Sequence, residues 1–159
     1  MTDAPPSSLV FRLADPAATD ALGRWLAQRL GPADVLLLEG PIGAGKTHVA
    51  RALIQHRLAA AARSEDVPSP TFTLVQVYDD GAGEIWHADL YRLSHPQEVA
   101  ELGLDEAFGT ALCLIEWPDR LGSLTPPGAL RLTLGDDGDG RRAALTGPAA
   151  RMAALGPLP

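Results

Sequence analysis

Apolar residues follow two different periods along the chain, and together these periods predict strands and helices in alternation. Residues 35–38 and 111–115 are uninterrupted apolar runs, which is typical of strands buried on both faces of a sheet. Residues 9–13 are a further short extended segment. Helical spacing of apolar positions appears in residues 16–30, after an Asp-Pro start, and again in residues 48–58. The pattern therefore predicts an α/β protein.

Two further pairs of extended segments are separated by short stretches rich in Asp and Gly. Such stretches favour turns, and a turn between two extended segments predicts a β-hairpin with an antiparallel strand pair. Residues 74–78 and 84–92 flank a turn at 79–83, and residues 129–134 and 141–145 flank one at 135–140. The predicted sheet is therefore mixed, with parallel and antiparallel strands flanked by helices.

The chain has the length of one domain. Its 159 residues contain no internal repeat and no linker between two apolar segments. Short helices are predicted at residues 95–102 and 104–108. We expect a flexible N-terminal arm at residues 1–8, one domain at 9–146, and a tail at 147–159 that is either a frayed helix or disordered.

A glycine-rich segment joins the first long apolar run to the second predicted helix. Its sequence, Gly-Pro-Ile-Gly-Ala-Gly-Lys-Thr, matches the phosphate-binding loop G-x-x-x-x-G-K-[ST] between a strand and a helix. Glycines let successive amides point at phosphate oxygens, the lysine reaches the β- and γ-phosphates, and the threonine hydroxyl binds Mg²⁺. A turn that only connects strand to helix would not require Lys-Thr at this spacing. The expected nucleotide-binding residues are Gly40, Pro41, Ile42, Gly43, Ala44, Gly45, Lys46, Thr47 and His48.

A phosphate loop also needs a carboxylate at the end of a neighbouring strand to complete the Mg²⁺ shell. Glu116 follows the apolar run 111–115 and is the first candidate for this role, although acids at strand ends are also common on surfaces. Asp89 is the second, as a ligand of a metal-bound water or as the group that orients the attacking water. His87 lies two residues before Asp89, on the same face of a strand, but no other His or Cys is placed to complete a zinc site.

Composition narrows the function further. The net charge of −7 argues against a broad basic surface that would grip nucleic acid directly. The chain contains no Asn, so the guanine-reading Asn-Lys-x-Asp motif is impossible and ATP is preferred over GTP. The single cysteine, Cys113, lies in an apolar run and indicates a reducing compartment. No secretory signal and no stretch long enough to span a bilayer is visible, so we expect a cytoplasmic protein without a membrane partner.

Four segments in this order and spacing resemble the TsaE family, the small bacterial ATPases of tRNA threonylcarbamoyladenosine biosynthesis. They are Gly-Ala-Gly-Lys-Thr at 43–47, Ser-Pro-Thr-Phe-Thr-Leu-Val at 69–75, His-Ala-Asp-Leu-Tyr-Arg-Leu at 87–93 and Ile-Glu-Trp-Pro at 115–118. The resemblance extends from about Val10 to Leu145. It implies a P-loop domain with a mixed sheet that binds ATP and hydrolyses it slowly. Pro41 and His48 depart from the residues that are usual at their positions.

The resemblance also implies roles for individual residues and partners. Mg²⁺ would be held by Thr47 and Glu116, and the catalytic residues would be Lys46, Asp89 and Glu116. Thr71 and Arg141 would lie near the nucleotide. The implied partners are the proteins TsaD and TsaB, whose complex handles the tRNA and which ATP hydrolysis resets between turnovers.

Two other functions remain compatible with the sequence. A small-molecule kinase can use the same phosphate loop, but it normally needs an acceptor pocket and a mobile lid with arginines, whereas residues 79–84 are short and acidic. A subunit that only senses ADP or ATP is the third possibility. Turnover rate and the effect of removing Asp89 or Glu116 would separate these readings.

Overall fold

The computed structural model describes residues 8–156, whose strands form one sheet in the order β1-β7-β6-β2-β5-β4-β3. The strands are β1 (Ser8–Leu13), β2 (Val35–Glu39), β3 (Val75–Asp79), β4 (Glu84–Asp89), β5 (Leu112–Glu116), β6 (Leu130–Asp137) and β7 (Gly140–Thr146). The helices are α1 (Pro16–Arg29), α2 (Lys46–Ala60), α3 (Gln97–Glu101), α4 (Leu104–Ala107), the 3₁₀ helix η1 (Pro118–Leu124) and α5 (Ala149–Ala154). Within residues 8–156, none of these helices has the length and apolarity that crossing a membrane requires.

The sheet is mixed, with its parallel strands at the centre. β4, β5, β2 and β6 run parallel to one another, whereas β3 pairs antiparallel with β4, and β7 pairs antiparallel with both β6 and β1. This confirms the predicted α/β fold with both hairpins. It also brings the carboxyl ends of β2, β4 and β5 to one edge of the sheet, which is where α/β proteins bind ligands.

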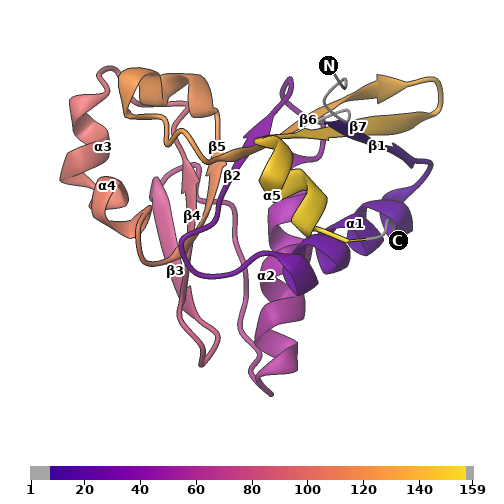
Figure 1. Ribbon diagram of the computed structural model, residues 1–159, viewed down its shortest axis with the longest axis horizontal. Helices are drawn as coiled ribbons and strands as arrows, with labels where there is room; N and C mark the ends of the chain where they lie inside the picture. Colours follow the sequence, from indigo (N-terminus) through magenta and orange to yellow (C-terminus); the bar gives the residue numbers. More distant parts are fainter. Residues whose placement is uncertain (1–7, 157–159) are drawn as a thin grey trace.

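Helices cover both faces of the sheet, and each face has its own apolar core (Figure 1). α1, α2 and α5 pack on one face against alternate residues of the strands, such as Leu36 and Leu38. α3, α4 and η1 cover the other face, which receives Val35 and Leu37. Because successive strand residues point to opposite faces, an uninterrupted apolar run is what a strand between two helical layers needs.

The strands of both hairpins differ in length from the sequence expectation. The extended segment expected at 84–92 ends at Asp89, because the Asp89 carboxylate accepts a hydrogen bond from the Tyr91 amide (3.0 Å) and turns the chain. The turn expected at 135–140 is shorter, since Asp137 still pairs with Gly140 and only two residues separate the strands. Gly138, with φ 63°, provides the left-handed backbone that such a tight turn requires.

The two ends of the chain differ in how much of them is described. Of the N-terminal arm expected at residues 1–8, only Ser8 lies within the described residues, and it begins β1. The segment expected to be a frayed helix or disordered contains α5. Met152 of this helix and Leu155, which follows it, are buried in the core with α1 and α2. Arg151 contacts Asp34 through two nitrogens, at 3.1 and 2.7 Å, and so links α5 to the start of β2.

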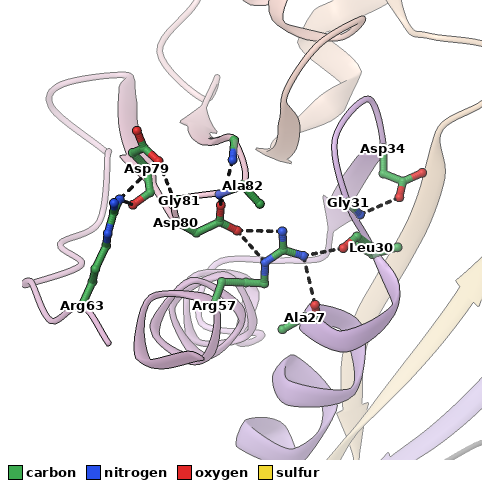
Figure 2. Close-up of polar contacts among 11 residues, drawn as sticks. Ala27, Leu30, Gly31, Asp34, Arg57, Arg63, Asp79, Asp80, Gly81 and Ala82 are labelled. Carbon is green, nitrogen blue, oxygen red and sulfur yellow. Dashed lines mark hydrogen bonds and ion pairs between the residues drawn. The ribbon is translucent and has the colours of Figure 1, made fainter. Parts of the chain in front are cut away.

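A buried ion pair joins α2 to the β3–β4 turn (Figure 2). The Arg57 guanidinium contacts Asp80 Oδ2 at 2.8 Å through Nε and at 2.7 Å through Nη2. Its Nη1 donates to the carbonyls of Ala27 and Leu30 at the end of α1. One side chain thus connects α2 and the end of α1 to the hairpin at the edge of the sheet. We call this network the Arg57 clamp.

Candidate functional site

The predicted phosphate loop runs from the end of β2 to the start of α2. Two glycines allow its close passage beside the last hairpin. A Cβ on Gly40 (φ 146°) would lie 2.5 Å from the Leu134 carbonyl oxygen, and one on Gly45 (φ 103°) would lie 2.5 Å from Arg141 Nη1. At Gly40 any other residue would clash with this backbone atom, and at both positions the positive φ would strain any other residue. The loop therefore lies against β6 and places Arg141 of β7 beside it.

The loop ends at the N-terminus of α2, which begins with Lys46. The amides of a first helical turn have no partner within the helix, and the helix dipole adds a partial positive charge there. Gly45 occupies the N-cap position without a side-chain cap, so no side chain competes for these amides. This is the arrangement in which a phosphate group binds at a helix N-terminus.

Lys46 is held over the loop by carbonyls and an aromatic ring. Its Nζ donates to the carbonyl oxygens of Gly40 and Pro41, and it lies 3.7 Å from the centre of the Trp117 ring. Burial lowers the pKa of Lys46, and the neighbouring carboxylates of Glu116, Asp89 and Asp119 partly offset this effect. A phosphate oxygen in place of the carbonyls would stabilise the charged ammonium further.

Thr47 and Glu116, the two expected metal ligands, are in direct contact. Thr47 Oγ1 lies 2.8 Å from Glu116 Oε1 and 3.1 Å from Oε2. Glu116 is 2% exposed, and its Oε2 also lies 2.6 Å from Nε2 of the fully buried His87. The strand register explains this meeting, because β5 pairs with both β2 and β4 and ends beside the loop.

Asp89 ends β4 beside Glu116, its register partner on β5. Its Oδ2 accepts a weak hydrogen bond from Thr71 Oγ1 (3.4 Å), and Thr71 in turn lies 2.8 Å from Ser69 Oγ. The Asp89 side chain is nearly buried and lines the same cavity as Glu116. The segment that contains Thr71 is therefore connected to the strand end that carries Asp89.

These groups surround one cavity of about 520 Å³. Gly40, Pro41 and Ala44, also expected in the site, do not line it; Gly40 and Pro41 instead hold Lys46 through their carbonyls. A second cavity of about 470 Å³ adjoins it and shares His48 and Arg141. The first cavity is lined by Ile42, Gly43, Gly45, Lys46, Thr47, His48, Thr71, Asp89, Tyr91, Glu116, Trp117 and Arg141.

Three residues of the site were not assigned to it from sequence. His87 was considered only as a metal ligand together with Asp89, yet it hydrogen-bonds Glu116 from the next strand. The sequence does not decide whether Trp117 and Tyr91 belong to a partner surface or to the nucleotide site. Their rings contact each other, with centroids 4.9 Å apart, and both line the cavity. The position directly after Glu116 is the signal that pointed to Trp117.

The donor set fits Mg²⁺ rather than a metal held by protein alone. Among residues 8–156, no group of three or more His, Cys, Asp or Glu side chains is arranged as a metal cage. Mg²⁺ usually keeps several waters and takes one or two protein oxygens together with phosphates. The adjacent hydroxyl of Thr47 and carboxylate of Glu116, beside a phosphate loop, match that requirement.

Comparison with known proteins agrees with this geometry. The family model "Threonylcarbamoyl adenosine biosynthesis protein TsaE" matches residues 13–144. The chain belongs to the TsaE family. A relative from Rickettsia felis, named tRNA threonylcarbamoyladenosine biosynthesis protein TsaE, is 41% identical over 73% of this chain and 66% of its own length, slightly less than two thirds.

Other TsaE relatives match over a larger share of their length. The protein of that name from Bacillus subtilis is 36% identical over 84% of this chain and 82% of its own. Among solved structures, the YdiB protein of Bacillus subtilis superposes with a TM-score of 0.74 and 30% identity, over 93% of this chain and 90% of that one. The P-loop type of the fold is thereby established.

Proposed function

We propose that this chain binds ATP with Mg²⁺, hydrolyses it slowly, and uses the hydrolysis to reset a TsaB–TsaD complex during tRNA threonylcarbamoyladenosine modification. The observation that carries the proposal is the contact of Thr47 Oγ1 with Glu116 Oε1 at 2.8 Å, directly behind a phosphate loop. The names of the TsaE relatives support the pathway. The tRNA reaches the chain only through the complex, in the cytoplasm, which agrees with the net charge of −7.

Each group of the site has a part in this activity. The loop amides and Lys46 bind the phosphates, and the nucleoside extends past His48 toward Arg141 and the adjoining cavity. Thr47 and Glu116 hold Mg²⁺, which neutralises charge on the phosphates when it is bound. Asp89 orients the attacking water or accepts its proton, since its carboxylate lies at the next strand end.

The electrostatics of the cavity explain why hydrolysis would need Mg²⁺. Glu116, Asp89 and Asp119 all act on the single buried Lys46. An ATP molecule brings several more negative charges to this site, and Lys46 and Arg141 together cannot compensate them. A divalent cation held by Thr47 and Glu116 would reduce this repulsion.

ATP hydrolysis by the purified protein tests the proposal, alone and then with TsaB, TsaD and tRNA. We expect slow basal turnover and multiple rounds of tRNA modification only when the intact protein is present. Lys46→Ala should lower hydrolysis about 100-fold, because it removes a preorganised cation from the charge that develops on the phosphates. Glu116→Ala should do the same and should abolish the response to Mg²⁺ concentration.

Three results would contradict parts of the proposal. If tRNA modification proceeds equally well without this protein, the role on the complex is wrong. Transfer of the γ-phosphate to a small acceptor at tens of turnovers per second would favour the kinase reading. If Asp89→Ala and Glu116→Ala support modification while Lys46→Ala does not, nucleotide binding alone matters and the protein is a sensor.

A further inference from the structure

We infer that His87 is a positioning residue, which holds the Glu116 carboxylate in the orientation that Mg²⁺ and nucleotide require. The inference rests on the proposed function and deepens it, because it concerns how the metal ligand of that site is held. His87 lies on β4, one strand away from Glu116, and is 0% exposed. It touches neither cavity and so has no direct contact with the ligand.

The geometry makes Glu116 the hydrogen-bond partner of His87. Nε2 lies 2.6 Å from Glu116 Oε2, which is a short, charge-assisted contact. Nδ1 has no hydrogen-bond partner among residues 8–156. Gln76, the residue opposite His87 on β3, donates its own amide to Thr73 instead. A carboxylate only accepts, so Nε2 carries the hydrogen in this contact.

Because of this contact, the two oxygens of the Glu116 carboxylate have different partners. Oε2 is tied from behind by His87, and Oε1 faces Thr47 at the shorter of its two distances, 2.8 Å. Without His87, the plane of the carboxylate could rotate about its last bond, and Oε1 would no longer be held toward Thr47. Groups that fix a ligating carboxylate in this way commonly change metal affinity 10- to 100-fold when they are removed.

A packing role alone does not explain a histidine at this position. Burying an imidazole with an unpartnered Nδ1 has a desolvation cost that a leucine or phenylalanine would avoid. The neighbouring positions that face the same way include Ile85 on the same strand and Leu114 across from His87, and both are apolar. The histidine therefore stands where the local environment alone would favour an apolar side chain.

Two amide substitutions separate the role of each ring nitrogen. The glutamine nitrogen reaches the position of Nε2, and the asparagine nitrogen reaches only the position of Nδ1. Binding of ADP to purified His87→Gln, His87→Asn and wild-type protein is measured by calorimetry, with Mg²⁺ and with EDTA. The gain in ADP affinity that Mg²⁺ produces is the readout, and it does not depend on hydrolysis.

We expect His87→Asn to lose most of that gain, about 10-fold or more. His87→Gln should keep it, and ADP affinity in EDTA should be the same in all three proteins. The EDTA measurement also shows that each variant is folded around an intact phosphate loop. His56→Asn, on α2 and outside both cavities beside the loop, is the matched control and should behave as wild type.

The outcomes distinguish this inference from the function on which it rests. If the wild type gains affinity from Mg²⁺ but His87→Asn gains as much, the positioning role is wrong and the proposed function stands. If His87→Gln and His87→Asn lose ADP binding equally in EDTA, His87 is structural and the inference is wrong. A wild-type protein that binds no ADP under either condition overturns both.

Discussion

Trp117 carries an uncommon backbone conformation for a large residue. Its φ and ψ are 58° and 55°, in the left-handed region that bulky side chains rarely adopt. This conformation follows Glu116 directly and brings the ring over Lys46 Nζ, 3.7 Å from the ring centre. Backbone strain of this kind concentrates at functional sites, where the surrounding contacts maintain it. Tyr91, which packs on the same ring, is one such contact.

Cys113 allows a test of the buried sheet at the level of one atom. Burial raises the pKa of its thiol to about 12, and the thiolate is the form that reacts with disulfide reagents. We therefore expect the native protein to be inert toward such a reagent at pH 8, and the chain to react once denaturant unfolds it. Since Cys113 is the only cysteine, the absorbance of the released product reports on this residue alone.

A rapid, stoichiometric reaction of the native protein at pH 8 would contradict the buried position of β5. Such a reaction would also question the site, because Glu116 at the end of β5 depends on the same strand placement.

At the scale of elements, α2 connects the phosphate loop to the rest of the fold. Its N-terminus follows the phosphate loop directly, and near its other end the Arg57 clamp ties it to α1 and to the β3–β4 turn (Figure 2). Asp80 also accepts hydrogen bonds from the amides of Ala82 and Gly83, so its carboxylate is satisfied on several sides. The clamp therefore holds α2, whose first turn carries the backbone amides that we propose bind the phosphates.

We expect Asp80→Ala to lower the free energy of unfolding by about 3 kcal/mol, because it leaves the Arg57 guanidinium partly buried without its charge partner. Asp79→Ala is the matched control. It removes the neighbouring ion pair between Asp79 and Arg63, in which the Arg63 side chain is 46% exposed and the Asp79 side chain 68% exposed. This substitution should change the free energy of unfolding by less than about 1 kcal/mol. Urea denaturation of the three proteins measures the difference, and equal losses would contradict the clamp.

The same pair predicts a pH dependence. Burial by itself would raise the pKa of Asp80, but the hydrogen bonds from Arg57, Ala82 and Gly83 outweigh it and lower the pKa below 3.8. A lowered carboxyl pKa contributes stability above the unfolded value and loses it as the pH falls through the folded value. The difference between wild type and Asp80→Ala should therefore be constant near neutral pH and shrink below a pH of about 3.8.

At the scale of the whole molecule, the site and the last helix lie at different ends of the parallel strands. The carboxyl ends of the parallel strands form the site at one edge, whereas α5 packs on the face that α1 and α2 cover (Figure 1). No residue of α5 lines the cavity of about 520 Å³ that contains Lys46 and Glu116. The last helix therefore contributes to the hydrophobic core but not to the lining of the candidate site.

Removal of residues 148–159 tests this separation. The truncated protein should lose about 3 kcal/mol of stability, because Met152 and Leu155 no longer bury their side chains, while ADP affinity at 20 °C should be unchanged. Ala150→Ser, at an exposed position of α5, is the control and should affect neither quantity. A large loss of ADP affinity in a truncated protein that is still folded would show that α5 does support the site.

The sequence by itself determined the features that depend on neighbouring residues. A strand, a glycine loop and a helix start are contiguous, so the placement of Lys46 and Thr47 follows from local backbone rules. The two hairpins and the helices on both faces follow equally from turn chemistry and apolar periods. The prediction of Glu116 as a metal ligand follows from such a pattern together with the nearby carboxylate that a phosphate loop needs. The roles of these residues stay predictions.

Only the tertiary structure decided which distant groups meet. His87 reaches Glu116 because β4 and β5 are neighbours in a particular register, and a shift by one residue would turn His87 to the other face. The same holds for Trp117 over Lys46 and for Arg57 at Asp80, which join segments far apart in the chain. Such contacts depend on strand order and packing. The sequence next to each of these residues does not indicate which strands become neighbours.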